Sequence, residues 1–198
     1  MSFITRGFSG RSRDRDPRLP PGQTLVGDWP VLSAGPTPRV EAHEWEFVVT
    51  TENGRRTWNW DEFRALGIED ITTDIHCVTH WSKLEMPWRG VPLDAVFAEV
   101  ETDHAYAMAH SYGGYTANVP IEDLQGGKAW VAFEADGEAL SPEHGGPARL
   151  LVPHLYFWKS AKWVRGLRIM DHDEPGFWEA NGYNNHGDPW KEQRYWTD

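Results

Sequence analysis

Alternation of apolar and polar side chains predicts short β-strands along most of the chain. Residues 44–50 and 55–60 alternate in this way, and Asn53-Gly54 stands between them. An Asn-Gly pair between two alternating segments favours a tight β-hairpin turn. Alternating or continuous apolar runs predict further strands over residues 71–78, 105–111, 130–134, 148–153 and 164–170.

Helical periodicity is confined to two short segments. Residues 60–67 have the pattern of a short helix that Gly67 ends, and residues 92–100 place apolar side chains at helical spacing after Pro92. The 14 prolines and 19 glycines interrupt the chain too often for long helices. The predicted fold class is therefore α+β, with mixed β-sheets and short helices.

The length of 198 residues suits one domain with a good core. Residues 1–24 are rich in arginine, end near Pro20-Pro21-Gly22 and are expected to form a flexible N-terminal arm. Residues 25–198 are expected to form the folded domain, including an aromatic C-terminal tail from residue 176.

Charge and composition limit the partners. The chain has 19 Lys and Arg against 30 Asp and Glu, a net charge of −11, which argues against nucleic-acid binding. No apolar segment approaches membrane-spanning length, and none near the N-terminus has the apolar core of a secretory signal. Because the chain also has a single cysteine, we expect a cytoplasmic protein. We expect no membrane insertion, and we expect a monomer.

Cys77 is the only cysteine, so it has no intramolecular disulfide partner. It is an inert core thiol, a nucleophile or a metal ligand, and His76 and His80 beside it make the reactive alternatives worth pursuing. Thiolate and imidazole suit zinc, although adjacent side chains of a strand point to opposite faces. Zinc thus remains an alternative.

Two further segments have the composition of an anion site. In His144-Gly145-Gly146-Pro147-Ala148-Arg149, the arginine could bind a phosphate or a pterin edge through two hydrogen bonds, or the segment could be a surface turn. In Lys159-Ser160-Ala161-Lys162, cations and small residues suit a phosphate, or the lysines could belong to an aromatic strand. Neither a G-x-S-x-G nor a G-x-G-x-x-G motif is present, which argues against hydrolase and Rossmann nicotinamide sites.

Taken together, these segments resemble the molybdenum-cofactor domain of the sulfite oxidase family. Residues 76–82 and 87–93 are similar to the family's segment around its cysteine ligand, residues 144–153 to its H-G-x-P-x-R-x-x-x-P signature, and residues 159–163 to its K-S-x-K loop. The resemblance covers residues 25–170. It is strongest to a small bacterial branch that includes the catalytic subunit of the methionine sulfoxide reductase system.

The resemblance implies a sulfite oxidase-type fold that binds molybdopterin and molybdenum. By position, Cys77 would be the thiolate on the metal, and His144 and Arg149 would contact the pterin. Ser160, Ala161 and Lys162 would hold the phosphate end, with Lys159 assisting. Further pterin contacts implied by position are Ser111, Trp29, Pro30 and Val31.

The resemblance also implies oxygen-atom transfer on a small, sulfur-containing substrate. No haem-binding segment is evident, so electrons would be exchanged with a separate redox partner. Tyr115 and His80 are candidates for the substrate pocket, and the aromatic tail is expected to pack over the site or to act as a structural clamp. A non-catalytic Trp-rich module that binds glycans or peptides is the alternative, although the single spacing of most tryptophans along predicted strands indicates core packing.

Overall fold

The computed structural model describes residues 16–198, which form two β-sheets and several short helices. The six-stranded sheet contains β1 (Thr24–Leu25), β4 (Glu69–His76), β5 (Trp81–Pro92), β8 (Trp130–Ala135), β9 (Glu138–Ala139) and β10 (Arg149–Leu151). The five-stranded sheet contains β2 (Glu46–Thr51), β3 (Gly54–Asn59), β6 (Tyr106–Ser111), β7 (Thr116–Pro120) and β11 (Val164–Met170). The fold class predicted from the sequence is confirmed.

Both sheets are mixed. The first has the order β1-β5-β8-β10, with β4 beside β5 and β9 beside β8; β1 and β5 are its parallel pair. The second has the order β3-β2-β11-β6-β7, in which β11 and β2 run parallel. The α-helices are α1 (Trp60–Ala65) and α2 (Leu93–Phe97). The 3₁₀ helices are η1 (Ala42–Glu44), η2 (Ile121–Asp123), η3 (Pro142–His144), η4 (Phe157–Lys159), η5 (Glu179–Asn181) and η6 (Pro189–Lys191).

Local sequence signals explain the first elements. Thr51 pairs with Gly54 at the predicted hairpin turn between β2 and β3. Asn59 then begins α1 with a capping box, since its side chain accepts hydrogen bonds from two backbone amides and Glu62 bonds back to the Asn59 amide. The predicted strands and helices are present, with ends shifted by a few residues.

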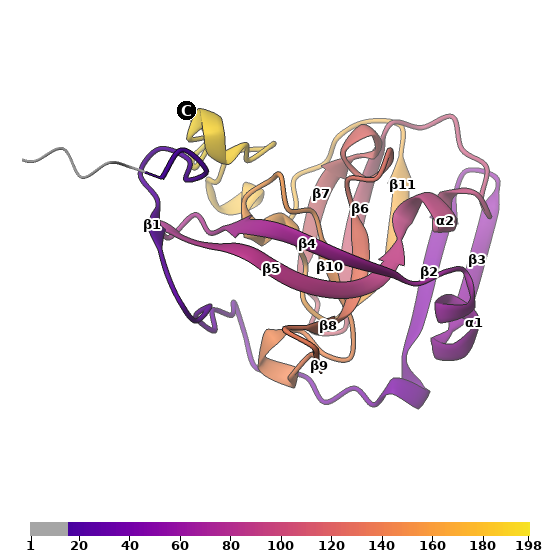
Figure 1. The fold of residues 1–198 in the computed structure, drawn as a ribbon. Helices are drawn as coiled ribbons and strands as arrows, with labels where there is room; N and C mark the ends of the chain where they lie inside the picture. The colour runs from indigo at the N-terminus through magenta and orange to yellow at the C-terminus, as the bar shows by residue number, and fades with distance from the viewer. Residues whose placement is uncertain (1–15) are drawn as a thin grey trace, which may run out of the picture.

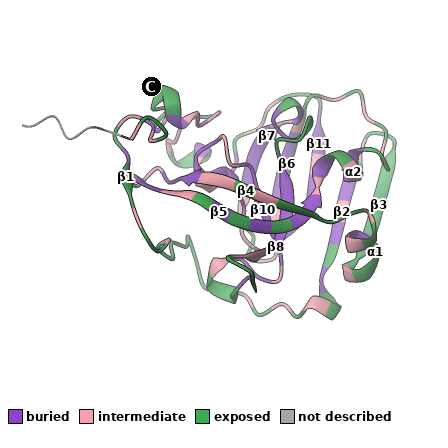
Figure 2. Ribbon diagram, viewed as in Figure 1, coloured by how far each residue is buried: buried purple, intermediate pink, exposed green. Residues whose placement is uncertain are grey.

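A core of aromatic and aliphatic side chains holds the two sheets together (Figure 2). Trp45, Phe47 and Phe63 pack on one another with ring centroids 4.8–6.0 Å apart, which places much of the apolar area next to the β2–β3 hairpin. The C-terminal tail lies at the opposite end of the molecule, near β1 (Figure 1).

Two regions differ from expectation. Residues 81–92 form one long strand, β5, which pairs with β4, β8 and β1, although Pro87 and the lack of alternation hid it in the sequence. Residues 1–15 of the expected flexible arm lie outside the described residues. Residues 16–24 are packed on the domain: Gln23 is buried and donates to the carbonyl of Cys77 at 3.0 Å. No helix within the described range is long and apolar enough to cross a bilayer.

Candidate functional site

One cavity of about 370 Å³ gathers segments that are far apart in the sequence. One side is formed by residues that we call the inner wall: Cys77, Arg149, Phe157, Trp158, Ser160, Ala161, Lys162 and Trp163. Phe177, Trp178 and Tyr183 of the C-terminal tail line it as well, and we call residues 176–183 the outer wall. Residues 29–36 close part of the remaining perimeter. The cavity is therefore a product of the tertiary fold.

Cys77 stands at the end of β4, where the chain turns into β5. Its amide donates to the carbonyl of Trp81 at 2.8 Å, and its carbonyl accepts from the amide of His80 at 3.1 Å. His80 closes this turn in a left-handed conformation at φ 71°, which is uncommon for a residue other than glycine. The two strands thus hold the sulfur in a fixed position at the cavity.

The Cys77 sulfur is 3.2 Å from the hydroxyl oxygen of Thr79, and the two groups form a hydrogen bond. Cys77 is only 7% exposed, and burial raises the pKa of its thiol, while the bond to Thr79 acts in the opposite direction. A buried thiol that carries its proton is a poor free nucleophile. It becomes a thiolate when a bound metal displaces the proton.

Arg149 is the most strongly buried cation of the inner wall, at 1% exposed. Its guanidinium donates to the carbonyls of His144 at 2.9 Å and Ser160 at 2.7 Å, while its Nε has no partner within the described structure. It lies over the ring of Phe157 at 4.0 Å. Burial lowers the pKa of Arg149 to about 9, so this site is short of negative charge.

Lys162 adds a second cation. Its ammonium donates to the carbonyls of Leu32 and Glu143, each at 2.6 Å, and it forms no ion pair with any described carboxylate. Burial first, and then the charge of Arg149, lower the pKa of Lys162 to about 8. Ser160 and Ala161, also lining the cavity, are tied to β10, since the amide of Leu150 donates to the Ala161 carbonyl at 2.8 Å.

His144 and the N-terminal segment meet at the edge of the cavity. The rings of His144 and Trp29 stack with centroids 3.9 Å apart and planes 5° from parallel. Burial lowers the pKa of His144, and the charges of Arg149 and Lys162 lower it further. Trp29 and Pro30 line the cavity. Val31, expected beside them, is half exposed and is not part of the wall.

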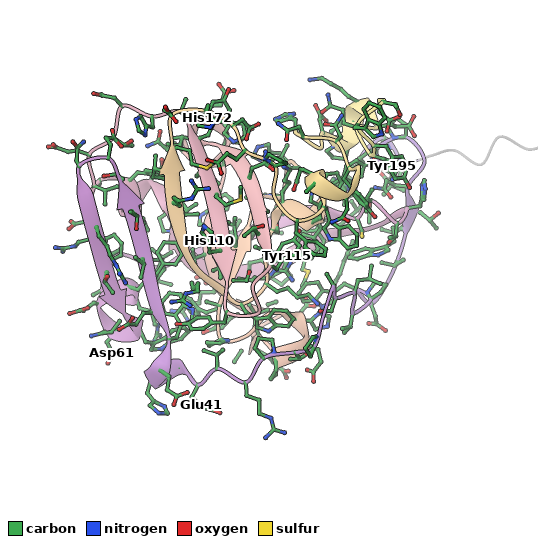
Figure 3. All side chains as sticks on the ribbon, turned by 180° about the vertical axis from the view of Figure 1, so that it is seen from behind. Glu41, Asp61, His110, Tyr115, His172 and Tyr195 are labelled. Carbon is green, nitrogen blue, oxygen red and sulfur yellow. The ribbon has the colours of Figure 1, made fainter. Side chains whose placement is uncertain are left out.

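Tyr115 lines the cavity from the turn between β6 and β7. Its hydroxyl donates to the carbonyl of Trp158 at 2.6 Å, and burial raises its pKa well above the usual value. Figure 3 shows Tyr115 on the side of the sheet that faces the tail carrying Tyr195. In this structure Tyr115 ties the inner wall to β7, and only its oxygen lone pairs remain to accept a bond.

The structure does not bring three of the expected residues to the cavity. His80 is exposed, and its Nδ1 hydrogen-bonds to the carbonyl of Gly22 at 3.0 Å, away from the sulfur. Ser111 is buried behind the wall, with its hydroxyl unpartnered. Lys159, the last residue of η4, is fully buried in an ion pair with Glu179 at 2.6 Å and does not line the cavity. None of the three lines the cavity, and their expected roles at the cofactor or the substrate stay predictions.

The zinc alternative finds no support. His76 hydrogen-bonds to the hydroxyl of Ser82 at 2.8 Å, and His80 turns to Gly22. Over residues 16–198, no group of three or more His, Cys, Asp and Glu side chains is arranged to hold a metal ion. Within residues 16–198, the cavity therefore offers a metal the single sulfur of Cys77 and no closed set of protein ligands such as structural zinc requires.

Sequence reasoning did not single out Thr79, although it lies in the recognised segment 76–82, and it missed the loop 32–36, which lines the cavity without a recognisable motif. Phe157, Trp158 and Trp163 do lie within a conspicuous aromatic segment, and their density next to two lysines was the available signal. The suggestion that the tail packs over the site agrees with the lining by the outer wall.

Comparisons with known proteins give consistent matches. A family model described as "Oxidoreductase molybdopterin binding domain" matches residues 34–178. The protein described as "Uncharacterized oxidoreductase YuiH" from Bacillus subtilis is 38% identical over 192 residues, which is 95% of this chain and 97% of that protein.

More distant relatives are longer. The protein-methionine-sulfoxide reductase catalytic subunit MsrP of Gluconobacter oxydans is 28% identical over 63% of this chain and 46% of its own length. The chain spans about half the length of these reductase relatives. The sulfane dehydrogenase SoxCD from Paracoccus pantotrophus has a TM-score of 0.61 at 23% identity, covering 69% of this chain and 40% of that one, which shows a shared fold.

Proposed function

This chain belongs to the oxidoreductase molybdopterin-binding domain family, and from that premise we propose that it transfers an oxygen atom to or from a small substrate at the cavity beside Cys77. The family assignment made from the sequence is confirmed, and with it the enzyme class and the molybdopterin cofactor. The observation that supports the site most directly is that the only cysteine lines the same cavity as the buried Arg149 and the partly buried Lys162, and neither cation forms an ion pair with a described carboxylate.

The residues present fit the cofactor. The Cys77 thiolate is a soft ligand that suits molybdenum, and no further protein ligand is needed when the pterin supplies sulfur of its own. The unpartnered Nε of Arg149 is a buried donor, and a buried donor without an acceptor is costly. A phosphorylated pterin next to Arg149 and Lys162 would supply that acceptor and the missing negative charge.

The chain's own groups have three tasks. The β4–β5 turn positions the sulfur, and the hydroxyl of Thr79 hydrogen-bonds to it, which would stabilise negative charge on the thiolate. Arg149 and Lys162 would hold the anionic cofactor, while the stack of Trp29 on His144 would cover the pterin edge. Aromatic side chains of both walls exclude water from the remaining space.

The bound molybdenum centre would change by two electrons and exchange an oxygen atom with the substrate. In the reductive direction, a sulfoxide, two electrons and two protons give a sulfide and water. A sulfur-containing substrate is supported by the relatives named as methionine-sulfoxide reductase subunits. Their description as subunits also supports a separate protein as the source or acceptor of the electrons.

The cytoplasmic location and the monomeric state stay predictions from the sequence. Cell fractionation and light scattering of the purified chain, respectively, check them. A non-catalytic Trp-rich binding module is not supported, because Trp45, Trp58 and Trp130 are all at least nine-tenths buried and present no stacking platform.

Metal and pterin analysis tests the proposal. After expression in cells that synthesise molybdopterin, the purified chain should contain about one molybdenum per molecule and fluorescent pterin after oxidation. A reduced-dye assay over sulfoxides, N-oxides and nitrate, with an oxidised-dye assay for sulfite, then identifies the substrate and the direction. A chain that folds but contains neither molybdenum nor pterin would overturn the proposal.

A further inference from the structure

We propose that Lys159 is a positioning residue that anchors the outer wall of the cavity and thereby controls which substrates reach the site. The resemblance placed this lysine at the cofactor phosphate. The structure gives it different neighbours, all of them from β7 and the C-terminal tail. The part of the inference that concerns substrates rests on the function proposed above.

The ammonium group of Lys159 has no hydrogen left for a phosphate. Its side chain is 0% exposed, and its nitrogen donates to the carbonyl and the side-chain oxygen of Asn118 at 2.7 and 3.0 Å. It also donates to the carbonyl of Asn185 at 2.7 Å and forms an ion pair with Glu179 at 2.6 Å. An ammonium has three hydrogens, and here four acceptors surround it.

Glu179 connects the tail to the inner wall. Its carboxylate is 2% exposed, and the oxygen that faces Lys159 also accepts from the indole nitrogen of Trp158 at 2.7 Å. Trp158 lines the cavity, so a single carboxylate joins the inner wall, through Trp158, to the tail. Breaking a buried pair from one side leaves an unpaired charge, which is strongly destabilising at that place.

The outer wall depends on this connection because regular structure contributes little to it. Residues 176–183 contain only the short helix η5, and the amide of Phe177 donates to the carbonyl of Thr116 at 3.0 Å. Gly176 packs closely on β7, where an added Cβ would lie 2.8 Å from the Cα of Ala117. In the sequence, Glu179 lies between Trp178 and Tyr183, two lining residues whose rings contact each other with centroids 4.9 Å apart, so the ion pair anchors the segment that carries both rings.

Lys162 provides the matched control. It is three residues from Lys159 and lines the cavity, and its ammonium donates to the carbonyls of Leu32 and Glu143 rather than to a residue of the tail. A Lys159→Met variant and a Lys162→Met variant each remove one positive charge from the same segment. The two variants should nonetheless change different properties of the protein: the stability of the tail in one and the retention of the cofactor in the other.

The test measures hydrogen exchange and cofactor content in the full-length chain. In Lys159→Met, amides of residues 176–186 should exchange about tenfold faster or more than in the unchanged chain, while molybdenum per molecule stays the same. In Lys162→Met, molybdenum content should fall and exchange in the tail should stay the same. With dimethyl sulfoxide as substrate, Lys159→Met should raise KM several-fold and leave kcat nearly unchanged, and it should admit a bulky aryl sulfoxide better.

The opposite pattern overturns the proposal: loss of molybdenum in Lys159→Met with unchanged exchange in the tail would place this lysine at the phosphate. If Lys159→Met does not fold, the double variant Lys159→Met, Glu179→Leu removes both buried charges and takes its place in the same measurements. Exchange can be measured without the cofactor, so it decides the role of the anchor even if the chain proves to bind no molybdenum.

Discussion

The inner and outer walls of the cavity are built in different ways. Cys77 and Arg149 stand at the ends of strands, and backbone hydrogen bonds to β5 and β10 hold their surroundings. Residues 176–183 have no strand of their own and depend on a buried ion pair and on aromatic contacts. The groups proposed to hold the cofactor are thus next to strands, whereas the wall proposed to face the substrate is on a segment with little regular structure.

The largest effect is expected from removing the sulfur of the inner wall. Cys77→Ser replaces a soft thiolate by a hydroxyl that is a poor ligand for molybdenum, and should lower turnover on the order of 100-fold or more. Circular dichroism should show an unchanged fold, because serine fits the volume. Turnover near the level of the unchanged chain would show that the cysteine is not the metal ligand.

The second largest effect is expected from removing Arg149, the buried cation of the inner wall. Arg149→Met deletes the buried guanidinium with its unpartnered Nε, and the loss of one or two charge-assisted bonds should reduce cofactor retention about 10- to 100-fold. Molybdenum analysis after dialysis measures this. The matching change on the exposed surface, Arg56→Met in β3, should leave retention unchanged, since Arg56 lies in the distant hairpin.

Anion binding at the inner wall should depend on pH through the charge of Lys162. The pKa of Lys162 is lowered to about 8, so its charge is present below that pH and is lost as the pH rises through it. The affinity of the cofactor-free chain for pyrophosphate should therefore fall between pH 7.5 and 9. Calorimetric titration checks this, and Lys162→Met should bind weakly throughout with a flatter pH profile.

The smallest effect is expected from trimming the outer wall. Trp178→Ala removes a ring that contacts Tyr183 with centroids 4.9 Å apart, and should raise KM roughly two- to tenfold with cofactor content unchanged. Steady-state kinetics of the molybdenum-loaded chain measure this change. A loss of molybdenum instead would mean that the two walls are not independent.

Much of the fold could be predicted from local signals. The Asn53-Gly54 turn, the short helix that starts at Trp60 and the alternating segments each depend on neighbours in the chain, and the structure has these elements where they were expected. The strand β5 escaped prediction, because its pairing with β4, β8 and β1 outweighs the low strand preference of Pro87.

The sequence by itself determined the family and the cofactor class, because these depend on residue types in a recognisable order. Only the tertiary structure decided which charges are available at the cavity. Lys159 and Lys162 look equivalent in the sequence, yet one is neutralised by Glu179 and the other faces the cavity without a carboxylate partner in the described chain. That difference arises from contacts with a tail that lies far along the chain, and neither periodicity nor spacing reports such contacts.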